Sequence, residues 1–425
     1  MKPGRLVQRR TFLKTSAAAL AAASIPTIIP AAALGKDGAV APSDKIVLGG
    51  IGVGRRGRYV LGRMLAEKGT QFVAACDVQA SRRQYVKHMV YGKYRNKDCV
   101  MYRDMFELLG RKDIDAVLIT TGDNWHALAS ILAAKAGKDV YCEKPCGMMF
   151  GDCQDLADTM NRYSRVFQAG TQRRSIGNFQ FAVHLARSGK LGKLNTLHAS
   201  INRLSVSHAW LPAQPEPDKD ICDWDRWLGP APWRPYNKRY VQGQWHGYAD
   251  LNAGARLLDW GSHTVDLCQW ANDADETTPI TYEPDGGTIN ARYANGVKLV
   301  IRPDKWLGLG TCPVRFEGDE GWIETGDTGR IVLQPASLMG ERKRYLRRGT
   351  DPAGHASNFF DCMKSRALTA ANANVMRQSH LACHAAAIAW QLGRKVTFDP
   401  VKEIFINDEK ANRMCTRAKR APWHV

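Results

Sequence analysis

A glycine-rich turn near the start of the chain places the strongest constraint on the fold. Gly52-Val53-Gly54-Arg55-Arg56-Gly57 follows a short apolar segment, 45–50, and opens a segment with helical spacing of apolar residues. In a strand–turn–helix unit such glycines permit a tight turn and let a pyrophosphate approach the backbone, where the helix N-terminus attracts its charge. The run therefore predicts a dinucleotide site in a Rossmann unit.

Asp77 bears on which dinucleotide is expected. It stands twenty residues after Gly57, at the end of the next apolar segment, where a carboxylate accepts hydrogen bonds from the adenosine ribose hydroxyls. The same carboxylate repels a 2′-phosphate, so we expect NAD. Arg82 and Arg83 follow closely, and because an arginine in this region can bind the 2′-phosphate, NADP remains the alternative.

The spacing of apolar segments changes near residue 171. Before it, short strands alternate with helices, which implies parallel crossovers and a doubly wound α/β sheet; the expected strands are 45–50, 72–76, 116–120, 140–142 and 166–170. After it, longer strands with hairpin turns predict an α+β domain on a large, mainly antiparallel, open-faced sheet; these strands are 194–203, 288–293, 297–302, 314–316 and 322–325. Helices at 357–392 are expected to close the fold.

The N-terminus is typical of an export signal. Arg9-Arg10, followed by Thr, Phe, Leu and Lys, precedes an Ala-rich apolar run, 16–33, and resembles the twin-arginine motif. That route exports folded proteins, which predicts a periplasmic or cell-envelope location. We therefore expect four parts: a signal peptide 1–35, a Rossmann domain 40–170, a substrate and oligomerisation domain 171–395, and a basic, irregular tail 396–425.

Charge and cysteine content exclude some classes of function. The formal net charge is +19, but Lys and Arg are scattered, so nucleic-acid binding is not expected. The densest basic clusters, 342–348 and 417–420, are interpreted as loops. Eleven cysteines without regular spacing make no disulfide framework, and no His or Cys pair completes a metal site around Cys142 and Cys146.

Two segments carry residues suited to proton transfer. Glu143-Lys144-Pro145 ends a predicted strand, at the sheet edge where ligands bind; alone, it could equally be a surface ion pair before a turn. Asp259, His263 and Asp266 share one face of an otherwise apolar predicted helix, and must either be satisfied internally or face a cleft. His263 is the best general base of the three by its pKa range.

These motifs, in this order, resemble the glucose–fructose oxidoreductase/inositol dehydrogenase/rhizopine catabolism (Gfo/Idh/MocA) family, from about residue 45 to 392. The loop 120–126 is similar to that family's loop after the fourth strand, with Gly122 where the family usually has Pro. The resemblance implies hydride transfer between a carbohydrate carbon and a nicotinamide, and an oligomer formed through the open sheet face. It implies catalytic roles for Lys144, Asp259 and His263, with Asp259 orienting or relaying. It also implies cofactor contacts by Thr121, Asn124, His126, Glu143, Lys144 and Gln172, and substrate contacts by Arg173, Asp259 and His263.

Export shapes the functional hypotheses. NAD is not expected outside the cytoplasm, so a folded protein should carry its cofactor tightly bound and run a redox-closed reaction. The main hypothesis is a sugar oxidoreductase that oxidises one sugar and reduces another. The alternatives are a redox-neutral, NAD-dependent glycoside hydrolase and a non-catalytic sugar-binding protein. A Trp-rich stretch, 209–245, could supply sugar-stacking faces, although core packing is the commoner use of Trp.

Overall fold

The computed structural model describes residues 40–346 and 353–423. The chain divides into two units, Met1–Lys45 and Ile46–Val425. The described part of the first unit holds one short 3-10 turn, η2 (Pro42–Asp44). The predicted signal peptide, 1–35, lies outside the described residues. Both sheets and all candidate site residues belong to the second unit.

The first sheet confirms the predicted doubly wound architecture. Six parallel strands run in the order β3-β2-β1-β4-β5-β6, so the order reverses between β1 and β4, where such sheets bind ligands. The strands are β1 (Ile46–Ile51), β2 (Thr70–Cys76), β3 (Val100–Tyr102), β4 (Ala116–Ile119), β5 (Asp139–Cys142) and β6 (Phe167–Ala169). The helices between them are α2 (Arg55–Met64), α3 (Ala80–Tyr94), α4 (Met105–Leu109), α5 (Asp123–Lys135) and α6 (Phe150–Arg162).

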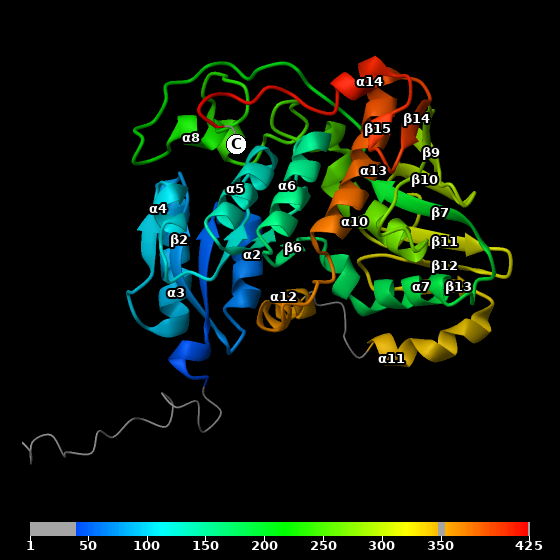
Figure 1. The fold of residues 1–425 in the computed structure, drawn as a ribbon, viewed down its shortest axis with the longest axis horizontal. Helices are drawn as coiled ribbons and strands as arrows, with labels where there is room; N and C mark the ends of the chain where they lie inside the picture. The colour runs from blue at the N-terminus through cyan, green and yellow to red at the C-terminus, as the bar shows by residue number, and fades with distance from the viewer. Residues whose placement is uncertain (1–39, 347–352, 424–425) are drawn as a thin grey trace, which may run out of the picture. The chain divides into compact units, whose positions relative to one another are not determined.

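A helix from much later in the chain completes the core of this sheet. Helix α12 (Ala353–Ser365) packs beside α2 (Figure 1). Its Phe359 and Phe360 lie in one buried cluster with Leu61 of α2 and Phe72 of β2. The predicted range of the second domain, 171–395, includes this helix, but its apolar face packs against the first sheet.

The second sheet has nine strands in the order β13-β12-β11-β7-β10-β9-β8-β14-β15. All pairs are antiparallel except β7–β10, and both predicted hairpins, β9–β10 and β11–β12, are present. The strands are β7 (Leu194–Ile201), β8 (Thr281–Asp285), β9 (Thr288–Arg292), β10 (Lys298–Pro303), β11 (Val314–Gly318), β12 (Trp322–Thr325), β13 (Ile331–Gln334), β14 (Val396–Asp399) and β15 (Ile404–Phe405).

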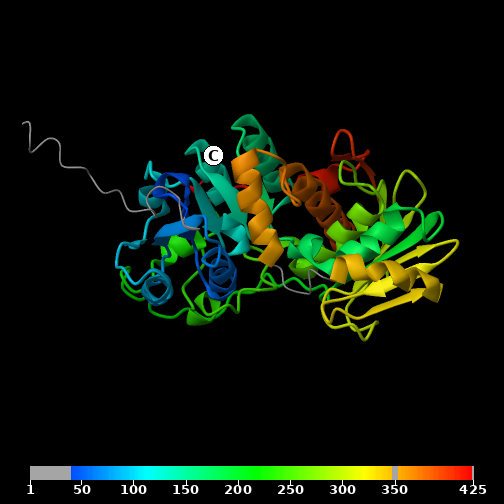
Figure 2. The same cartoon turned by 90° about the horizontal axis from the view of Figure 1, so that it is seen from below.

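Helices pack against this sheet and link it to the first one (Figure 2). Helix α10 (Leu257–Ala271) lies on β7, α7 (Gly177–Arg187) on β12, and α13 (Ala373–Leu392) on β8. Helix α13 also packs against α6 of the first domain. The smaller helices are η3 (Gln172–Ser175), α8 (Trp224–Leu228), α9 (Lys238–Val241), η4 (Ala253–Arg256), η5 (Ala336–Arg342), α11 (Lys343–Leu346) and α14 (Glu409–Arg413).

The segment after residue 395 differs from the expected irregular tail. Strand β14 pairs with β8, and β15 pairs with β14. Phe398 and Phe405 are buried and pack their rings against Phe150 of α6. Strands of four and two residues are too short to produce a periodic pattern that sequence analysis can detect.

The Trp-rich stretch, 209–245, forms a small unit over the first sheet. Trp224 stacks on Trp227 and on Tyr240, with ring centroids 4.9 and 5.9 Å apart, in a buried cluster of its own. An antiparallel bridge between Gln79 and Cys222 attaches it to the edge where β2 ends, and α8 lies near α5 in Figure 1. Core packing, rather than an exposed sugar platform, is therefore the role of Trp224.

Disulfides, membrane-spanning helices and metal-binding clusters are all absent from the described residues. All eleven cysteines are free, and all except Cys415 are buried, as expected for small apolar side chains. Within the described ranges, no helix combines the length and the hydropathy needed to cross a membrane. Searching the same ranges reveals no group of three or more His, Cys, Asp or Glu side chains arranged for a metal ion.

Candidate active site

The glycine turn packs tightly against the loop after β4. Gly52 has φ +70°, and a Cβ there would lie 2.7 Å from the Cα of Thr121. A Cβ on Gly57 would lie 2.1 Å from the Oγ1 of Thr120, so this glycine lets α2 pack against β4. Gly54 caps α2 without a side-chain hydrogen bond, which leaves the first N–H groups of the helix available to a phosphate.

The other residues of the turn have different surroundings. Val53 is fully buried, so it offers only its backbone to a ligand. Arg55 is exposed at the start of α2. Arg56 extends toward the end of β5, where its Nε lies 3.0 Å from Glu143 Oε1. Of the predicted cofactor residues in this run, Gly52 and Arg56 line two different pockets.

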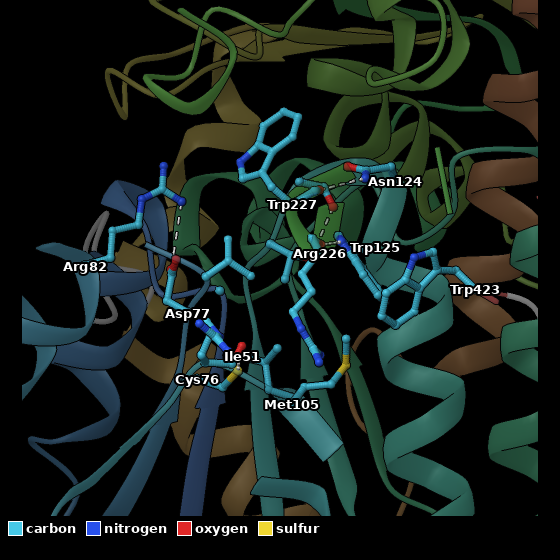
Figure 3. A pocket seen from close by; sticks show the side chains of 15 residues that line it. Ile51, Cys76, Asp77, Arg82, Met105, Asn124, Trp125, Arg226, Trp227 and Trp423 are labelled. Carbon is cyan, nitrogen blue, oxygen red and sulfur yellow. Dashed lines mark hydrogen bonds and ion pairs between the residues drawn. The ribbon is translucent and has the colours of Figure 1, made fainter. Parts of the chain in front are cut away.

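The first of these, the adenosine pocket, lies at the ends of β1 and β2 (Figure 3). Asp77 is buried there; its Oδ1 accepts from the backbone N–H of Gln79 at 2.9 Å. Its Oδ2 is buried without a hydrogen-bond partner in the described part of the chain, and burial raises the pKa of Asp77 above its ordinary value. An unsatisfied buried carboxylate oxygen needs a donor, and a ribose hydroxyl fits that requirement, so the pocket suits the adenosine end of a dinucleotide.

Arg82 and Arg83 do not separate NAD from NADP. Arg82 lines the adenosine pocket, with Nη1 3.9 Å from Asp77 Oδ2. Arg83 is occupied instead by backbone carbonyls, those of Asp77 at 2.6 Å and Asp220 at 3.1 Å. Asp77 favours ribose hydroxyls, whereas the guanidinium of Arg82 can donate hydrogen bonds to a 2′-phosphate.

The loop after β4 divides between the pocket and the interior. Thr121 and Asn124 line the adenosine pocket, and Asn124 also donates to the carbonyl of Leu228 at 2.7 Å. His126 is 2 % exposed and bonds the carbonyl of Pro145 through Nδ1 at 2.6 Å. It therefore lies behind the 143–145 turn, which it supports from within.

Glu143 joins three elements at the end of β5. Its Oε1 accepts from Arg56 of α2 and, at 2.6 Å, from Gln172 Nε2 of η3. Its Oε2 accepts from the backbone N–H of Lys144 at 3.3 Å. This carboxylate thereby fixes the start of Lys144, whose Nζ crosses to α10 and donates to the backbone carbonyl of Asp259 at 2.5 Å.

Asp259, near the start of α10, is a fixed anion. Its Oδ1 accepts from Asn252 at 2.8 Å, and His246 Nδ1 lies 3.7 Å from the same oxygen. Burial would raise the pKa of this carboxyl, but the interaction with His246 and the charge of Lys144 outweigh burial and hold it at about 2. Asp259 stays ionised at any physiological pH.

His263, one turn further along α10, is a neutral base. It is 1 % exposed, and its Nε2 lies 2.8 Å from Arg173 Nη1. A guanidinium only donates, so Nε2 is the acceptor and the proton of the neutral ring sits on Nδ1. Burial, followed by the charges of Arg173 and Lys144, lowers the pKa of His263 well below its ordinary value.

The proposed orienting role of Asp259 toward His263 has no hydrogen bond to support it in the described residues. Asp259 bonds Asn252 and lies within reach of Arg256 and His246, while His263 bonds Arg173. The charge of Lys144 acts on both groups, since it lowers the pKa of Asp259 and that of His263. Trp260 lies between the cations, with its ring centroid 5.7 Å from both Lys144 Nζ and the Arg173 guanidinium carbon.

Arg173 belongs to the second pocket, here called the Arg173 pocket. Its Nη2 and Nε lie 2.6 and 3.1 Å from the carboxylate of Asp327. Gln172 and Asn178 line the same pocket, and the side-chain oxygen of each is buried without a partner among residues 40–346 and 353–423. The pocket also includes Arg56, so it offers both hydrogen-bond donors and unsatisfied acceptors.

Asp266, the third acidic or basic residue on this face of α10, has a structural role. Both its oxygens accept from Arg174, at 2.7 and 2.9 Å, and Arg174 also binds Asp275. Arg174 and Asp266 are each almost completely buried. The face that sequence analysis treated as one stripe therefore divides into a cleft end and a core end.

Several site residues were not found from the sequence. Asn252 donates to Asp259 Oδ1 and also to Asp123 Oδ2, at 2.8 and 2.9 Å, and so connects α10 to the start of α5. Burial, with the charge of Asp259 adding to it, raises the pKa of Asp123. His246 and Asp327 come from loops. Their positions depend on tertiary contacts, and no spacing in the sequence signals them.

A prediction follows for the ionisation of His263. The ring should stay neutral, with its proton on Nδ1, at pH values well below 6.5, the usual His pKa. Replacing Arg173 with Met removes a nearby cation, so the pKa of His263 should rise, whereas Arg173→Lys should keep it low. NMR titration of the labelled imidazole nitrogens measures both quantities without any substrate. Ordinary titration of His263 near pH 6.5 in the unmodified protein would contradict the assignment.

The fold and the site define an oxidoreductase with a Rossmann cofactor domain. Residues 46–171 match the oxidoreductase family profile described as the NAD-binding Rossmann fold, and residues 204–425 match its C-terminal alpha/beta domain. The chain belongs to the Gfo/Idh/MocA family of oxidoreductases. It is accordingly an NAD-binding enzyme of this family, as the sequence analysis predicted.

Curated relatives resemble part of the chain. An α-N-acetylgalactosaminidase of Shewanella oneidensis is 33 % identical over 175 residues, which is 37 % of each chain. An inositol 2-dehydrogenase of Salmonella typhimurium is 31 % identical over 152 residues, 35 % of this chain and 43 % of that one. A 2,7-anhydro-N-acetylneuraminate hydratase of Mediterraneibacter gnavus is 29 % identical over 143 residues, 33 % of this chain and 36 % of that one. The matches thus span less than half of these relatives.

Solved structures share the fold over most of the chain. The WlbA dehydrogenase from Bordetella pertussis, in complex with NADH and UDP-GlcNAcA, superposes with a TM-score of 0.64 at 16 % identity and covers 84 % of this chain and 98 % of that one. The aldose-aldose oxidoreductase from Caulobacter crescentus, complexed with glycerol, gives 0.59 at 16 % identity, covering 83 % and 100 %. At this identity the likeness establishes the fold.

Proposed function

We propose that this protein transfers hydride between a carbohydrate carbinol carbon and a nicotinamide dinucleotide that it retains through turnover. The observation that carries the proposal is the convergence of a neutral His263 and the cation of Lys144 around Trp260, beside the turn that receives the dinucleotide. A proton acceptor and a fixed cation are what the oxidation of a hydroxyl requires from the protein.

The side chains have separable tasks in this proposal. The substrate hydroxyl takes the place of Arg173 at His263 Nε2, and His263 accepts its proton. Lys144, held by the Asp259 carbonyl and the charge of its carboxylate, stabilises the developing alkoxide. When bound, the dinucleotide supplies the chemistry of hydride acceptance and return. After Arg173 gives up its contact with His263, the carboxylate of Asp327 remains its partner.

The Arg173 pocket supports a carbohydrate as the substrate. The unsatisfied side-chain oxygens of Gln172 and Asn178 need donors. The guanidinium groups in the pocket already have acceptors, because Arg173 pairs with Asp327 and Arg56 with Glu143. A sugar hydroxyl is both a donor and an acceptor. A polyol can therefore donate to both unsatisfied oxygens, which an apolar or a purely anionic ligand cannot do.

Export by the twin-arginine route remains part of the proposal. It places the enzyme in the periplasm or cell envelope, where no pool of free NAD can exchange with the bound cofactor. A redox-closed cycle follows, in which one sugar is oxidised and another is reduced. We also expect a homo-oligomer, which sedimentation of the purified protein measures.

A redox-neutral glycoside hydrolase is the second candidate, favoured by the names of relatives. Besides the α-N-acetylgalactosaminidase, a glycosyl hydrolase family 109 protein of Shewanella is 34 % identical over 175 residues. In that chemistry a carbinol is oxidised to a ketone, and a base removes the acidified neighbouring C–H proton. The glycosidic bond then breaks by elimination, water adds across the resulting alkene, and the hydride returns to the ketone.

One experiment separates these functions. The protein is purified without added cofactor and denatured, and the released dinucleotide is quantified by absorbance and mass spectrometry. The native protein then receives a panel of sugars and glycosides with no cofactor added. Stoichiometric NAD(H) with sugar-to-sugar redox exchange supports the oxidoreductase, and glycoside cleavage without net redox change supports the hydrolase. A protein that turns over only with millimolar external NAD contradicts the retained-cofactor proposal, and sugar binding without turnover indicates a binding protein.

A further inference from the structure

The adenosine pocket is closed by residues from outside the Rossmann domain. Figure 3 shows Asp77 and Arg82 at one end of the pocket, and Trp423 at the other, with Arg226 between them. Arg226 and Trp227 belong to α8, and Trp423 lies close to the C-terminus. A dinucleotide in this pocket would therefore contact two segments that are not part of the strand–turn–helix unit.

Helix α8 is held onto the Rossmann domain by polar contacts on several elements. The Arg226 guanidinium pairs with Asp104 at the start of α4, at 2.7 Å. The backbone carbonyl of Arg226 accepts from the indole N–H of Trp125 at 2.8 Å. Asn124 donates to Leu228 from the same side. Because Asn124, Trp125 and Arg226 also line the pocket, these contacts attach α8 at the edge of the pocket. Helix α8 is here called the cover.

The C-terminal segment 416–423, here called the strap, holds this cover in turn. In Figure 1 the red end of the chain runs from α14 back across to α8. Arg420 lies under α8 and donates to the carbonyls of Gly229 and Asp225, at 3.0 and 2.8 Å. It also pairs with the carboxylate of Asp225 at 2.5 Å. One guanidinium thus binds three acceptors around the end of α8.

Trp423 forms the end wall of the pocket. It packs edge-on against Trp125, with ring centroids 5.1 Å apart and planes at 71°. It is 9 % exposed, and its indole N–H is buried with no hydrogen-bond partner among the described residues. A buried indole normally has an acceptor for its N–H. The missing partner, at the edge of a ligand pocket, indicates that the site is completed by a ligand.

We infer that the strap is a component of the dinucleotide site: Trp423 closes the adenosine pocket, and Arg420 locks α8 over it so that the cofactor does not dissociate between turnovers. This deepens the retained-cofactor part of the proposed function and gives it a structural cause. The adenosine end can leave only after α8 or the strap moves away from the rim. Breaking the Arg420 contacts removes that barrier without touching the glycine turn, Asp77 or the catalytic residues.

The test measures dissociation of the dinucleotide from the full chain. The protein is loaded with NADH, excess NAD is added as a chase, and the loss of protein-bound NADH fluorescence gives the dissociation rate. Arg420→Ala and Trp423→Ala should each raise that rate by about tenfold or more, the scale expected for one aromatic wall or charged contact. Both variants should also lose NAD(H) during gel filtration. The loss is measured by denaturing the filtered protein and quantifying the dinucleotide that it releases.

Matched variants keep the test interpretable. Arg413→Ala, which removes an exposed ion pair of the preceding helix, should behave like the unmodified protein. Asp225→Asn removes the carboxylate partner of Arg420 and replaces Arg420→Ala in the test if that variant fails to fold. Dissociation rates within twofold of the unmodified protein for both Arg420→Ala and Trp423→Ala overturn the inference. Unmodified protein that retains NADH but turns over no sugar would overturn the proposed function and leave the strap untouched.

Discussion

Replacing His263 with Ala is expected to lower kcat/KM by about 10²–10⁴-fold, the usual contribution of one general base. The ring is buried and neutral, and among residues 40–346 and 353–423 its one hydrogen bond is made through the nitrogen that would accept the substrate proton. The loss should appear in the rate of single-turnover reduction of the bound dinucleotide, with whichever sugar the panel identifies. Because His263 lies apart from the adenosine pocket, dinucleotide content should stay unchanged.

His184→Ala is the matched control for this prediction. His184 lies on α7, partly exposed and paired with Glu341, so its removal should leave kcat/KM within about twofold, as for other surface substitutions. A His263→Ala enzyme with near-normal kcat/KM would exclude His263 as the base.

Replacing Arg174 with Ala is expected to lower the free energy of unfolding by about 3–5 kcal/mol, as for other buried ion pairs that lose one partner. Arg174 and Asp266 have side-chain exposures of 3 % and 1 %. Without the guanidinium, the Asp266 carboxylate would be left buried and unpaired, and Asp275 would lose its partner as well. Urea unfolding followed by tryptophan fluorescence measures the difference.

The control for Arg174 is Arg187→Ala. Arg187 pairs with Asp273 at the surface, where both side chains are well exposed, so its loss should cost less than about 1 kcal/mol. An Arg174→Ala protein that unfolds at the same urea concentration as Arg187→Ala would show that the pair does not stabilise the junction of η3 with α10.

The glycine turn, five of the six strands of the first sheet and both hairpins could be predicted because each depends on local chemistry; the short edge strand β3 was not predicted. Gly52 adopts a positive φ, and Gly57 lies at a helix–strand contact too close for a side chain. Both positions therefore favour glycine, and the glycines in the sequence reveal them. Lys144 and His263 could be singled out for similarly local reasons: Lys144 follows a predicted strand, and His263 is a polar residue on an otherwise apolar predicted helix.

What could not be predicted depends on contacts between distant segments. Nothing in the sequence around Arg420 or Trp423 indicates that they reach α8 and the adenosine pocket. Asn252 has no special spacing, yet it bridges Asp123 and Asp259. The Asp259–His263 spacing suggested a direct pair, but their neighbours are Asn252 and Arg173, because the two side chains leave α10 toward different partners.

The position of α12 has a consequence for the order in which this protein matures. The core of the first sheet includes Phe359 and Phe360, which leave the ribosome roughly two hundred residues after the last strand of that sheet. A nascent chain that has completed β6 therefore still exposes the surface of Leu61 and Phe72 that α12 covers. The core of the cofactor domain is thus complete only when the chain has been synthesised at least as far as residue 360.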